Sequence, residues 1–314
     1  MNPKFTYYAG NYLRQLLPRR PFHAKLPHKL TAARAYDQDY LNSRVDYYNK
    51  LEGQRSLGEA CFPLSEFRFG IKPKTYFFDA YRYLRYFPPQ LRVCFLFGDV
   101  TTVPQEPSFV KSRPIEGDNA NSVLLKLNWI RHFNFVNDRR PWRSKRDILV
   151  GRSNVTQENR KRFLKSYFGH RLCDVGQVNR EGGDRRWLMP RMSIREHLRY
   201  KFVLCLEGND VASNLKWVMS SNSLAVMPPP RYETWFMEGR LEADQHYVAL
   251  RDDYADLEEK LLYYQEHPAE AEAILARAHE HVAQFRNPGR EEAISFLTIQ
   301  KYFKKTGQGA QLTS

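Results

Sequence analysis

The sequence predicts an α/β protein with parallel sheets. Short apolar runs alternate with stretches of helical periodicity over most of the 314 residues, a pattern typical of parallel sheets with covering helices. The clearest run is 202–206, which is followed by a glycine turn. With 42% hydrophobic residues, the chain is long enough for two such domains. In such folds, ligands bind at the carboxyl ends of the strands.

The predicted elements follow one another with few interruptions. The first 60 residues favour helices broken near Pro18, Pro21 and Pro27, and aromatic residues are dense over 67–89. Strands are predicted at 92–97, 147–151, 202–206, 223–227 and 246–250. Helices are predicted at 121–132, at 157–167, after a cap at Asn209 or Asp210, at 256–265, and from Pro268 onward. The basic, proline-broken segment 138–146 predicts an N-terminal domain of residues 1–145 and a C-terminal domain of 146–314, whose last helix can cross back.

The charge of the chain predicts an anionic partner. The formal net charge is +14, and no acidic residue precedes Asp37. The basic residues of that first segment alternate with Tyr and Leu; they are Lys4, Arg14, Arg19, Arg20, Lys25, Lys29 and Arg34. The segment fits either an anionic membrane surface or a solvated basic face. Nucleic acid is a third, less favoured partner, because no signature of a nucleic-acid-binding motif is present.

The chain lacks an apolar run of the roughly 18–20 residues that span a bilayer, and it begins without the apolar core of a secretory signal. Its four cysteines, Cys61, Cys94, Cys173 and Cys205, are widely spaced and form no C-x-x-C motif. We therefore expect buried free thiols and a cytoplasmic protein.

Two strand-turn-helix connections are candidates for binding phosphate. The first contains Gly151, Arg152 and Ser153, with Arg160 on the following helix. The second contains Glu207, Gly208, Asp210, Ser213, Asn214 and Lys216. Backbone N–H groups at a helix start and nearby cations suit a diphosphate. A plain connection within an α/β domain is the alternative for each turn taken alone.

Asp99 is the candidate catalytic base, because it follows the predicted strand 92–97 and a carboxylate there can take a proton from a hydroxyl. An ordinary turn aspartate is the alternative. Lys111, Arg113 and Asn121 lie in a polar region before a predicted helix and are candidates for contacting a sugar or phosphate; a capped helix start with solvated charge is the alternative. The sequence gives little sign of a metal site. His279 and His281 lie on different faces of a predicted helix. Asp37-Gln-Asp39 matches the D-x-D motif of metal-dependent nucleotide-sugar enzymes, but no predicted strand precedes it.

Several blocks resemble glycosyltransferase family 90 in a fixed order. They are 210–217, 223–226, 232–236 and 246–257, and stretches at 97–100, 110–115, 121–126, 131–133 and 172–176 resemble the bacterial branch, which includes lipopolysaccharide glycosyltransferases. The resemblance spans roughly residues 65–290 and implies a GT-B fold, in which two Rossmann-like domains face a cleft. It also implies a UDP-sugar donor, inversion at the anomeric carbon and no obligatory metal or other cofactor.

Carried over by position, Asp99 resembles the base of the family, Lys216 and Glu233 lie in nucleotide-binding blocks, and Arg152 and Arg160 lie in a phosphate block. Two departures are visible: Val150 stands where the family commonly has an arginine before Gly151, and the eukaryotic arginine near Asn214 is missing.

The expected function is transfer of a hexose or pentose from a UDP-sugar to a lipopolysaccharide-core or other surface-glycan hydroxyl. We expect the protein to be cytoplasmic and to associate with the inner face of the inner membrane. The alternative is a non-catalytic sugar- or anion-binding protein of the same fold.

Overall fold

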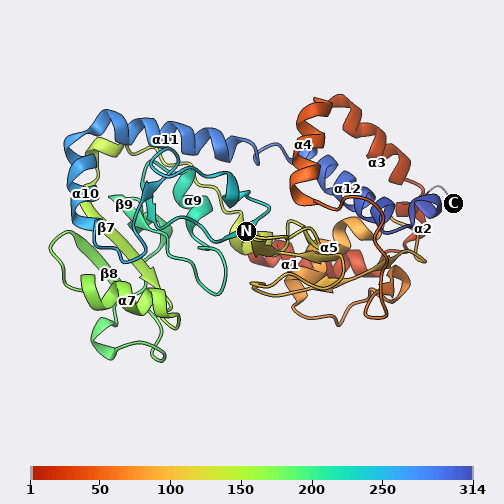
Figure 1. Ribbon diagram of the computed structural model, residues 1–314, viewed down its shortest axis with the longest axis horizontal. Helices are drawn as coiled ribbons and strands as arrows, with labels where there is room; N and C mark the ends of the chain where they lie inside the picture. The colour runs from red at the N-terminus through yellow and green to blue at the C-terminus, as the bar shows by residue number, and fades with distance from the viewer. Residues whose placement is uncertain (1–2, 313–314) are drawn as a thin grey trace. The chain divides into compact units, whose positions relative to one another are not determined.

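The computed structural model describes residues 3–312, which form two compact units (Figure 1). The N-terminal unit holds the described residues up to Arg131, together with Tyr232–Phe236 and those from Arg286 onward. The C-terminal unit holds His132–Arg231 and Met237–Phe285. The chain first leaves the N-terminal unit before the basic segment 138–146, and it returns to that unit twice.

The C-terminal unit is built on a parallel sheet. Its strands are β7 (Arg146–Ser153), β8 (Cys173–Gln177), β9 (Tyr200–Leu204), β10 (Leu224–Met227) and β12 (Val248–Ala249). Their order in the sheet is β12-β10-β9-β7-β8, and all four pairings are parallel. Counted along the chain, this is the 2-1-3-4-5 order of a doubly wound sheet. The prediction of an α/β fold with parallel sheets is confirmed.

Helices cover the sheet of the C-terminal unit and complete its core (Figure 1). They are α7 (Glu158–Tyr167), α8 (Ile194–His197), α9 (Leu215–Met219), α10 (Leu257–Glu266) and α11 (Pro268–Ala283). Phe163 of α7, Leu261 of α10 and Ile274 of α11 belong to one buried cluster with strand residues such as Phe202 and Val226. This cluster holds the strand ends in place, so the turns that follow them are built on a rigid support.

The N-terminal unit contains smaller sheets. Three parallel strands, in the order β3-β4-β6, are β3 (Phe95–Leu96), β4 (Ser108–Val110) and β6 (Ser122–Leu124). Two antiparallel pairs join β1 (Phe62–Pro63) to β2 (Arg92–Val93) and β5 (Ser112–Pro114) to β11 (Tyr232–Thr234). Cys94 separates β2 from β3, so the single strand predicted at 92–97 is divided in two.

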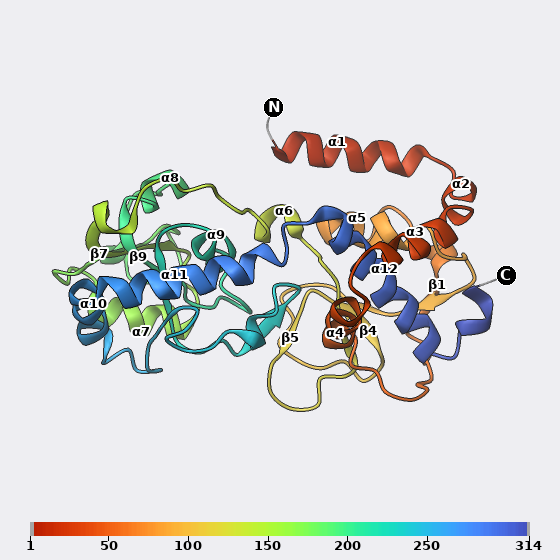
Figure 2. The ribbon, with the colours of Figure 1, turned by 90° about the horizontal axis from the view of Figure 1, so that it is seen from above.

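The helices of the N-terminal unit are α1 (Pro3–Leu16), α2 (Arg20–His23), α3 (Leu26–Ala32), α4 (Gln38–Tyr48), α5 (Lys74–Leu84) and α12 (Pro288–Lys305). The short helix α6 (Trp129–His132) spans the division between the units. Short 3-10 turns lie at Ala33–Ala35, Leu64–Glu66, Trp142–Ser144, Arg185–Trp187, Glu238–Arg240 and Gly309–Leu312. Helix α12 packs against α3, α4 and α5, whereas α1 lies at the outer edge of the unit (Figure 2).

Buried charges join the elements of the N-terminal unit. Arg44 of α4 is fully buried and pairs with Glu291 of α12 at 2.9 Å. Glu291 also accepts a hydrogen bond from the indole of Trp235 at 2.6 Å. Tyr48 accepts from Arg44 and stacks on Trp235, with the ring centroids 3.8 Å apart. Every polar group of this network has a partner, which is the condition for tolerating buried charge.

Two local predictions were wrong. The helix predicted at 121–132 is instead strand β6 followed by the short helix α6, because 122–124 adds to the parallel sheet. The helix expected to begin after Asn209 or Asp210 begins at Leu215 and has five residues. Among the described residues, no helix is long and apolar enough to cross a membrane.

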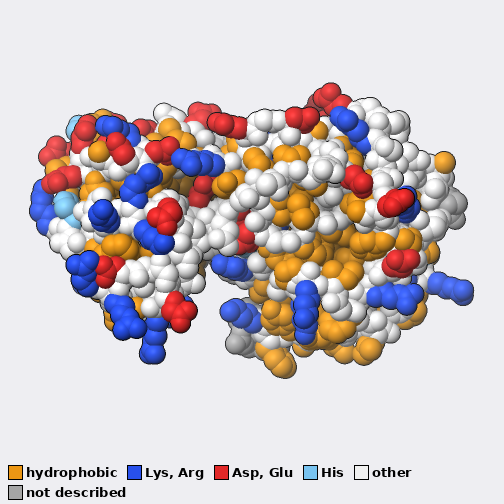
Figure 3. Space-filling model, turned by 60° about the horizontal axis from the view of Figure 1, so that its bottom comes forward, with side chains coloured by type: hydrophobic (Ala, Val, Ile, Leu, Met, Phe, Trp, Pro, Cys, Tyr) orange, Lys and Arg blue, Asp and Glu red, His pale blue; other side chains and the backbone are white. Residues whose placement is uncertain are grey.

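The surface of the N-terminal unit exposes several large hydrophobic side chains, and Figure 3 shows such side chains gathered on one face of this unit, on the right of the view. Cationic side chains lie around this apolar area in the same view.

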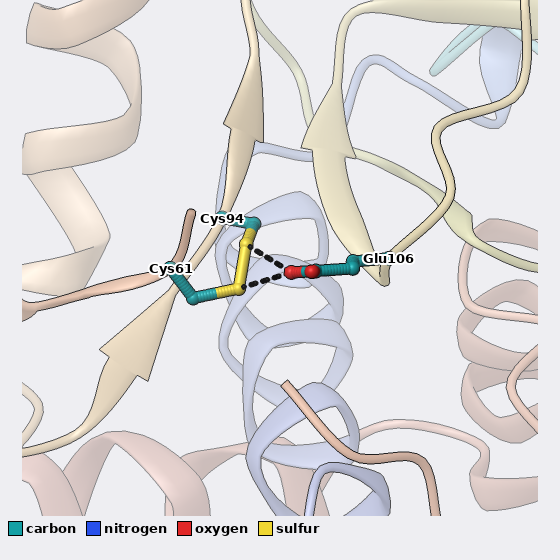
Figure 4. Close-up of side chains that lie close together, drawn as sticks. All are labelled: Cys61, Cys94 and Glu106. Atoms are coloured by element: carbon teal, nitrogen blue, oxygen red, sulfur yellow. Dashed lines mark hydrogen bonds between the residues drawn. A yellow bond between two sulfur atoms is a disulfide. The ribbon is translucent and has the colours of Figure 1, made fainter. Parts of the chain in front are cut away.

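The expectation of four free thiols was wrong for two of the cysteines. Cys61 and Cys94 form a disulfide, with their Cα atoms 4.5 Å apart, while Cys173 and Cys205 are free (Figure 4). Both disulfide sulfurs lie within 3.4 Å of the carboxylate of Glu106. These three side chains form the one group in the described part of the chain with the spacing of a metal site. The bonded sulfurs offer no thiolate to a metal.

Candidate active site

The order of the strands marks one position in the C-terminal unit as a binding crevice. From β7 the chain runs to β8 on one side, while β9 pairs with β7 on the other side. At such a switch point the connections diverge, and a crevice opens beyond the carboxyl ends of the two central strands. The turns after β7 and β9 border this crevice, and they are the two turns that the sequence identified as phosphate-binding candidates.

The structure brings these two turns together through side-chain hydrogen bonds. The amide of Gln157 donates to the side chain of Asn209 at 2.8 Å, and that of Asn159 donates to the carbonyl of Glu207 at 3.1 Å. Arg160 donates to the carbonyls of Asn154 and Leu206, at 2.8 and 2.9 Å. The start of α7 thus holds the turn after β9.

The glycines of the two turns have different surroundings. A Cβ on Gly208 would lie 3.2 Å from the guanidinium of Arg160, so the glycine lets this cation approach the backbone closely. A Cβ on Gly151 would lie 3.0 Å from the Cβ of Leu204 on the neighbouring strand β9. Gly151 therefore serves the packing of adjacent strands, which the sequence analysis had not considered.

Arg152 and Ser153 are the last two residues of β7. The guanidinium of Arg152 pairs with Asp174 on the adjacent strand β8 at 2.5 Å and also donates to backbone carbonyls, including that of Pro190 at 3.1 Å. A phosphate contact by Arg152 would require these bonds to rearrange. Arg160 also donates to backbone carbonyls, but it lies between the two turns.

Lys216 is fully buried, although the sequence suggested a phosphate contact. Its Nζ lies 2.5 Å from the carboxylate of Glu238, which is also buried. Asp210 is buried as well, while Ser213 and Asn214 are partly exposed, and the amide of Asn214 donates to the carbonyl of Leu204 at 2.8 Å. The amide of Asn214 thus ties the segment between β9 and α9 to the sheet, while the charge of Lys216 joins α9 to the turn at Glu238.

A cavity of about 470 Å³ in this unit is lined by Glu158, Asn159, Arg162, Arg231 and Asp252. It adjoins the two turns, because Asn159 bonds the carbonyl of Glu207 and the backbone N–H of Arg231 donates to the Glu207 carboxylate at 3.0 Å. The sequence analysis missed Arg162 and Arg231. The position of Arg231, just after the proline run that ends β10, was the signal that could have identified it.

In the N-terminal unit, Asp99 lies at the carboxyl end of the parallel sheet. It follows β3, and Lys111 follows the adjacent strand β4. The buried ammonium of Lys111 lies 2.5 Å from the partly exposed carboxylate of Asp99, and the hydroxyl of Tyr76 on α5 donates to the same oxygen at 3.4 Å. A neighbouring cation stabilises the ionised carboxylate, which is the form that accepts a proton.

The other three site candidates of this unit have structural partners. Arg113 and Glu233 face each other in the β5–β11 pair and form a buried ion pair at 2.8 Å. Ligand binding by either would require this pair to open. Asn121 precedes β6, and its amide donates to the carbonyls of Pro104 and Gln105. It therefore lies at the opposite end of the parallel strands from Asp99.

These features define an α/β protein with two joined turns at the switch point of a parallel sheet in one unit and a carboxylate at a strand end in the other. A family model for glycosyl transferase family 90 matches residues 127–289. The O-glucosyltransferase LpsA of Dichelobacter nodosus is 48% identical over 263 residues, which cover 84% of this chain and 82% of that protein. An uncharacterized protein, 027R, of Frog virus 3 (isolate Goorha) is 32% identical over 127 residues, which are 39% of this chain and 13% of the viral protein. The chain belongs to glycosyl transferase family 90, and its substrates are a sugar donor and a glycan acceptor.

Proposed function

We propose that the protein transfers a sugar from a UDP-sugar to a hydroxyl of a lipopolysaccharide-core or other surface glycan, with inversion at the anomeric carbon. The observation that supports this most is the crevice at the β7–β9 switch point, where both candidate turns lie together. The proposal includes a GT-B arrangement, in which the C-terminal unit binds the nucleotide and the N-terminal unit binds the acceptor.

In the proposed reaction, the acceptor oxygen attacks the anomeric carbon while the bond from that carbon to the diphosphate oxygen breaks. The hydroxyl proton passes to Asp99, and the diphosphate leaves with the electron pair of the broken bond. The transition state resembles an oxocarbenium ion, as in glycoside hydrolysis. Lys111 holds the carboxylate of Asp99 in place and favours its ionised form.

The departing diphosphate needs positive charge near the crevice. Arg160 lies between the two turns, and Arg162 and Arg231 line the adjoining cavity. We propose that these guanidinium groups stabilise the leaving group by binding phosphate oxygens with two parallel hydrogen bonds. Their present contacts, among them the ion pair of Arg231 with Asp252 at 2.8 Å, open when the diphosphate binds. The proposal therefore assigns the transfer no obligatory metal. Lys216 then acts through its pair with Glu238, by holding the segment after β9.

The bacterial relative is an O-glucosyltransferase, which supports glucose as the first sugar to test. A lipopolysaccharide core is the first acceptor to test. A cytoplasmic location at the inner membrane face is part of the same proposal. The Cys61–Cys94 disulfide removes the argument from free thiols, so the location is supported by the basic, Tyr- and Leu-containing N-terminal segment alone.

The proposal is tested by Asp99→Asn, with Asp118→Asn as the matched control because Asp118 is an exposed carboxylate of the same unit. We expect Asp99→Asn to bind UDP with unchanged affinity in calorimetry and to lose at least about a hundredfold in kcat, the scale of a lost general base. Full turnover by Asp99→Asn would refute the assignment of the base. UDP binding without turnover of any UDP-sugar by the wild type would favour the non-catalytic alternative, and activity lost on metal chelation would refute the metal-independent mechanism.

A further inference from the structure

We propose that the outward face of α1, together with Phe69, binds the surface of an anionic phospholipid bilayer. The exposure and charge of the N-terminal unit support this binding whether or not the proposed transfer reaction is correct.

Helix α1 is attached to its unit by a face that is mostly aromatic and polar. Tyr7 is buried, donates to the carboxylate of Asp79 at 2.7 Å, and packs edge-on against Trp129 with the ring centroids 5.4 Å apart. Asn11, one turn further along, is also buried and donates to the carbonyl of Tyr7. The position of α1 is therefore specified by contacts that leave its other face uncovered.

The opposite face of α1 is apolar and exposed. Phe5, Leu13 and Leu16 are 67, 64 and 80% exposed, and Tyr12 is 41% exposed. At 100° per residue these four positions fall on one side of the helix, opposite Tyr7 and Asn11. A helix on the surface of a globular protein ordinarily turns such a stripe toward the core. Here the stripe faces outward, so folding of the chain leaves it uncovered.

The apolar surface continues beyond α1. The ring of Phe69 is 49% exposed and lies 5.6 Å from that of Tyr12, centroid to centroid, and Leu17 at the end of the helix is 50% exposed. A contiguous exposed patch of this kind marks an interaction surface.

The charges around the stripe select the partner. No acidic residue lies between residues 3 and 36, and Lys4, Arg20 and Lys25 are exposed there. Near Phe69, the exposed side chains of Arg68, Lys72 and Lys74 add further positive charge, and the ammonium of Lys74 lies 5.7 Å from the centre of the Phe69 ring. Apolar side chains that enter the acyl boundary, with cations beside them at the phosphate level, are the recognised pattern of an interfacial helix.

A second copy of the chain fits this face less well. A symmetric dimer would place the same cationic surface against itself, since both copies present the same patch. Like charges would then approach one another, which disfavours association. An anionic bilayer satisfies the apolar stripe and the charge at the same time.

The experiment measures co-sedimentation of the full chain with vesicles of phosphatidylglycerol mixed with phosphatidylcholine, and with vesicles of phosphatidylcholine alone. We expect binding to the anionic vesicles that weakens with added salt. The double variant Leu13→Ser/Leu16→Ser should lower partitioning at least about tenfold, because two apolar side chains no longer enter the interface. Leu188→Ser, which replaces a 45% exposed leucine of the C-terminal unit, is the matched control and should bind as the wild type does.

A second variant, Arg20→Gln/Lys25→Gln, tests the charge without touching the stripe, and it should bind less and with a weaker salt dependence. Circular dichroism and thermal unfolding establish that each variant is folded. Equal binding to neutral and anionic vesicles, or wild-type partitioning of the serine double variant, would overturn the proposal. It would also be overturned if the wild type ignores vesicles and instead dimerises in sedimentation velocity through a contact that Leu13→Ser/Leu16→Ser abolishes.

Discussion

The buried pair of Lys216 and Glu238 provides a direct test of how the C-terminal unit is held together. The two charged groups lie 2.5 Å apart, with the side chains 0 and 1% exposed. Lys216→Met removes the ammonium and leaves the Glu238 carboxylate without its main counter-charge in a site that excludes water. Glu238→Gln leaves the lysine in the same position without its anion.

Removal of one member of a buried ion pair typically costs about 3–5 kcal/mol, since the remaining charge stays desolvated and uncompensated. We therefore expect either single variant to lower the free energy of unfolding by about that amount. The double variant Lys216→Met/Glu238→Gln buries no net charge, so its loss should be smaller than the sum of the two single losses by at least about 2 kcal/mol.

The assay is urea unfolding followed by intrinsic fluorescence, with UDP affinity measured by calorimetry on the same preparations. Glu272→Gln, which breaks the exposed Arg143–Glu272 pair on the surface of the same unit, is the control and should unfold like the wild type. If Lys216→Met unfolds like the wild type but no longer binds UDP, the structural role is refuted and Lys216 is a ligand contact.

Three further predictions concern other parts of the fold. Burial raises the pKa of Asp79 to about 7, against 3.8 for the free carboxyl, so the folded state holds its proton more tightly than the unfolded state. Thermal stability should then be highest near pH 4 and should fall by up to about 4 kcal/mol as the pH rises through 7, a slope that Asp79→Asn should largely remove. Thiol titration of the protein unfolded without reductant should give two thiols, and a count of four would refute the Cys61–Cys94 disulfide. Serine replacement of both cysteines opens this link, which has a sequence separation of 33, and should lower the free energy of unfolding by about 4 kcal/mol. Gly151→Ala should destabilise the fold by about 1–3 kcal/mol, because the new Cβ crowds against β9. Gly10→Ala on α1, where a Cβ meets no atom within 4 Å, should be neutral or stabilising by up to about 1 kcal/mol. Equal effects of the two changes would contradict the role of Gly151 in strand packing.

Local sequence patterns predicted much of the C-terminal unit. Strands β7, β9 and β10 and helices α7 and α10 lie close to the predicted ranges, because each has a regular periodicity and is ended by glycine, proline or a polar turn. The N-terminal unit was predicted less well. Its strands have two or three residues, too few to show a period, and residues 121–132 had helical spacing but joined a sheet.

Part of the candidate site was also visible in the sequence. Polar residues that follow buried strands in a parallel sheet must lie at one edge, which is why the turns after β7 and β9 were identified in advance and do lie together. The roles of the individual cations did not follow from position. The sequence made Arg152 and Arg160 equal candidates for binding phosphate. In the structure Arg152 is bound to β8, while Arg160 lies between the turns.

The α/β class, the candidate turns, the family resemblance and the excess of positive charge could all be predicted in advance, because they depend on residue type and short-range spacing. The pairing of the charges became visible in the folded structure alone. Arg113 meets Glu233 across 120 residues, and Lys216 meets Glu238 across 22. The tertiary structure also decided that the apolar stripe of α1 faces outward. The physical reason is the same in each case: burial and partnership are set by segments distant in the chain, and no local pattern records which of them will meet.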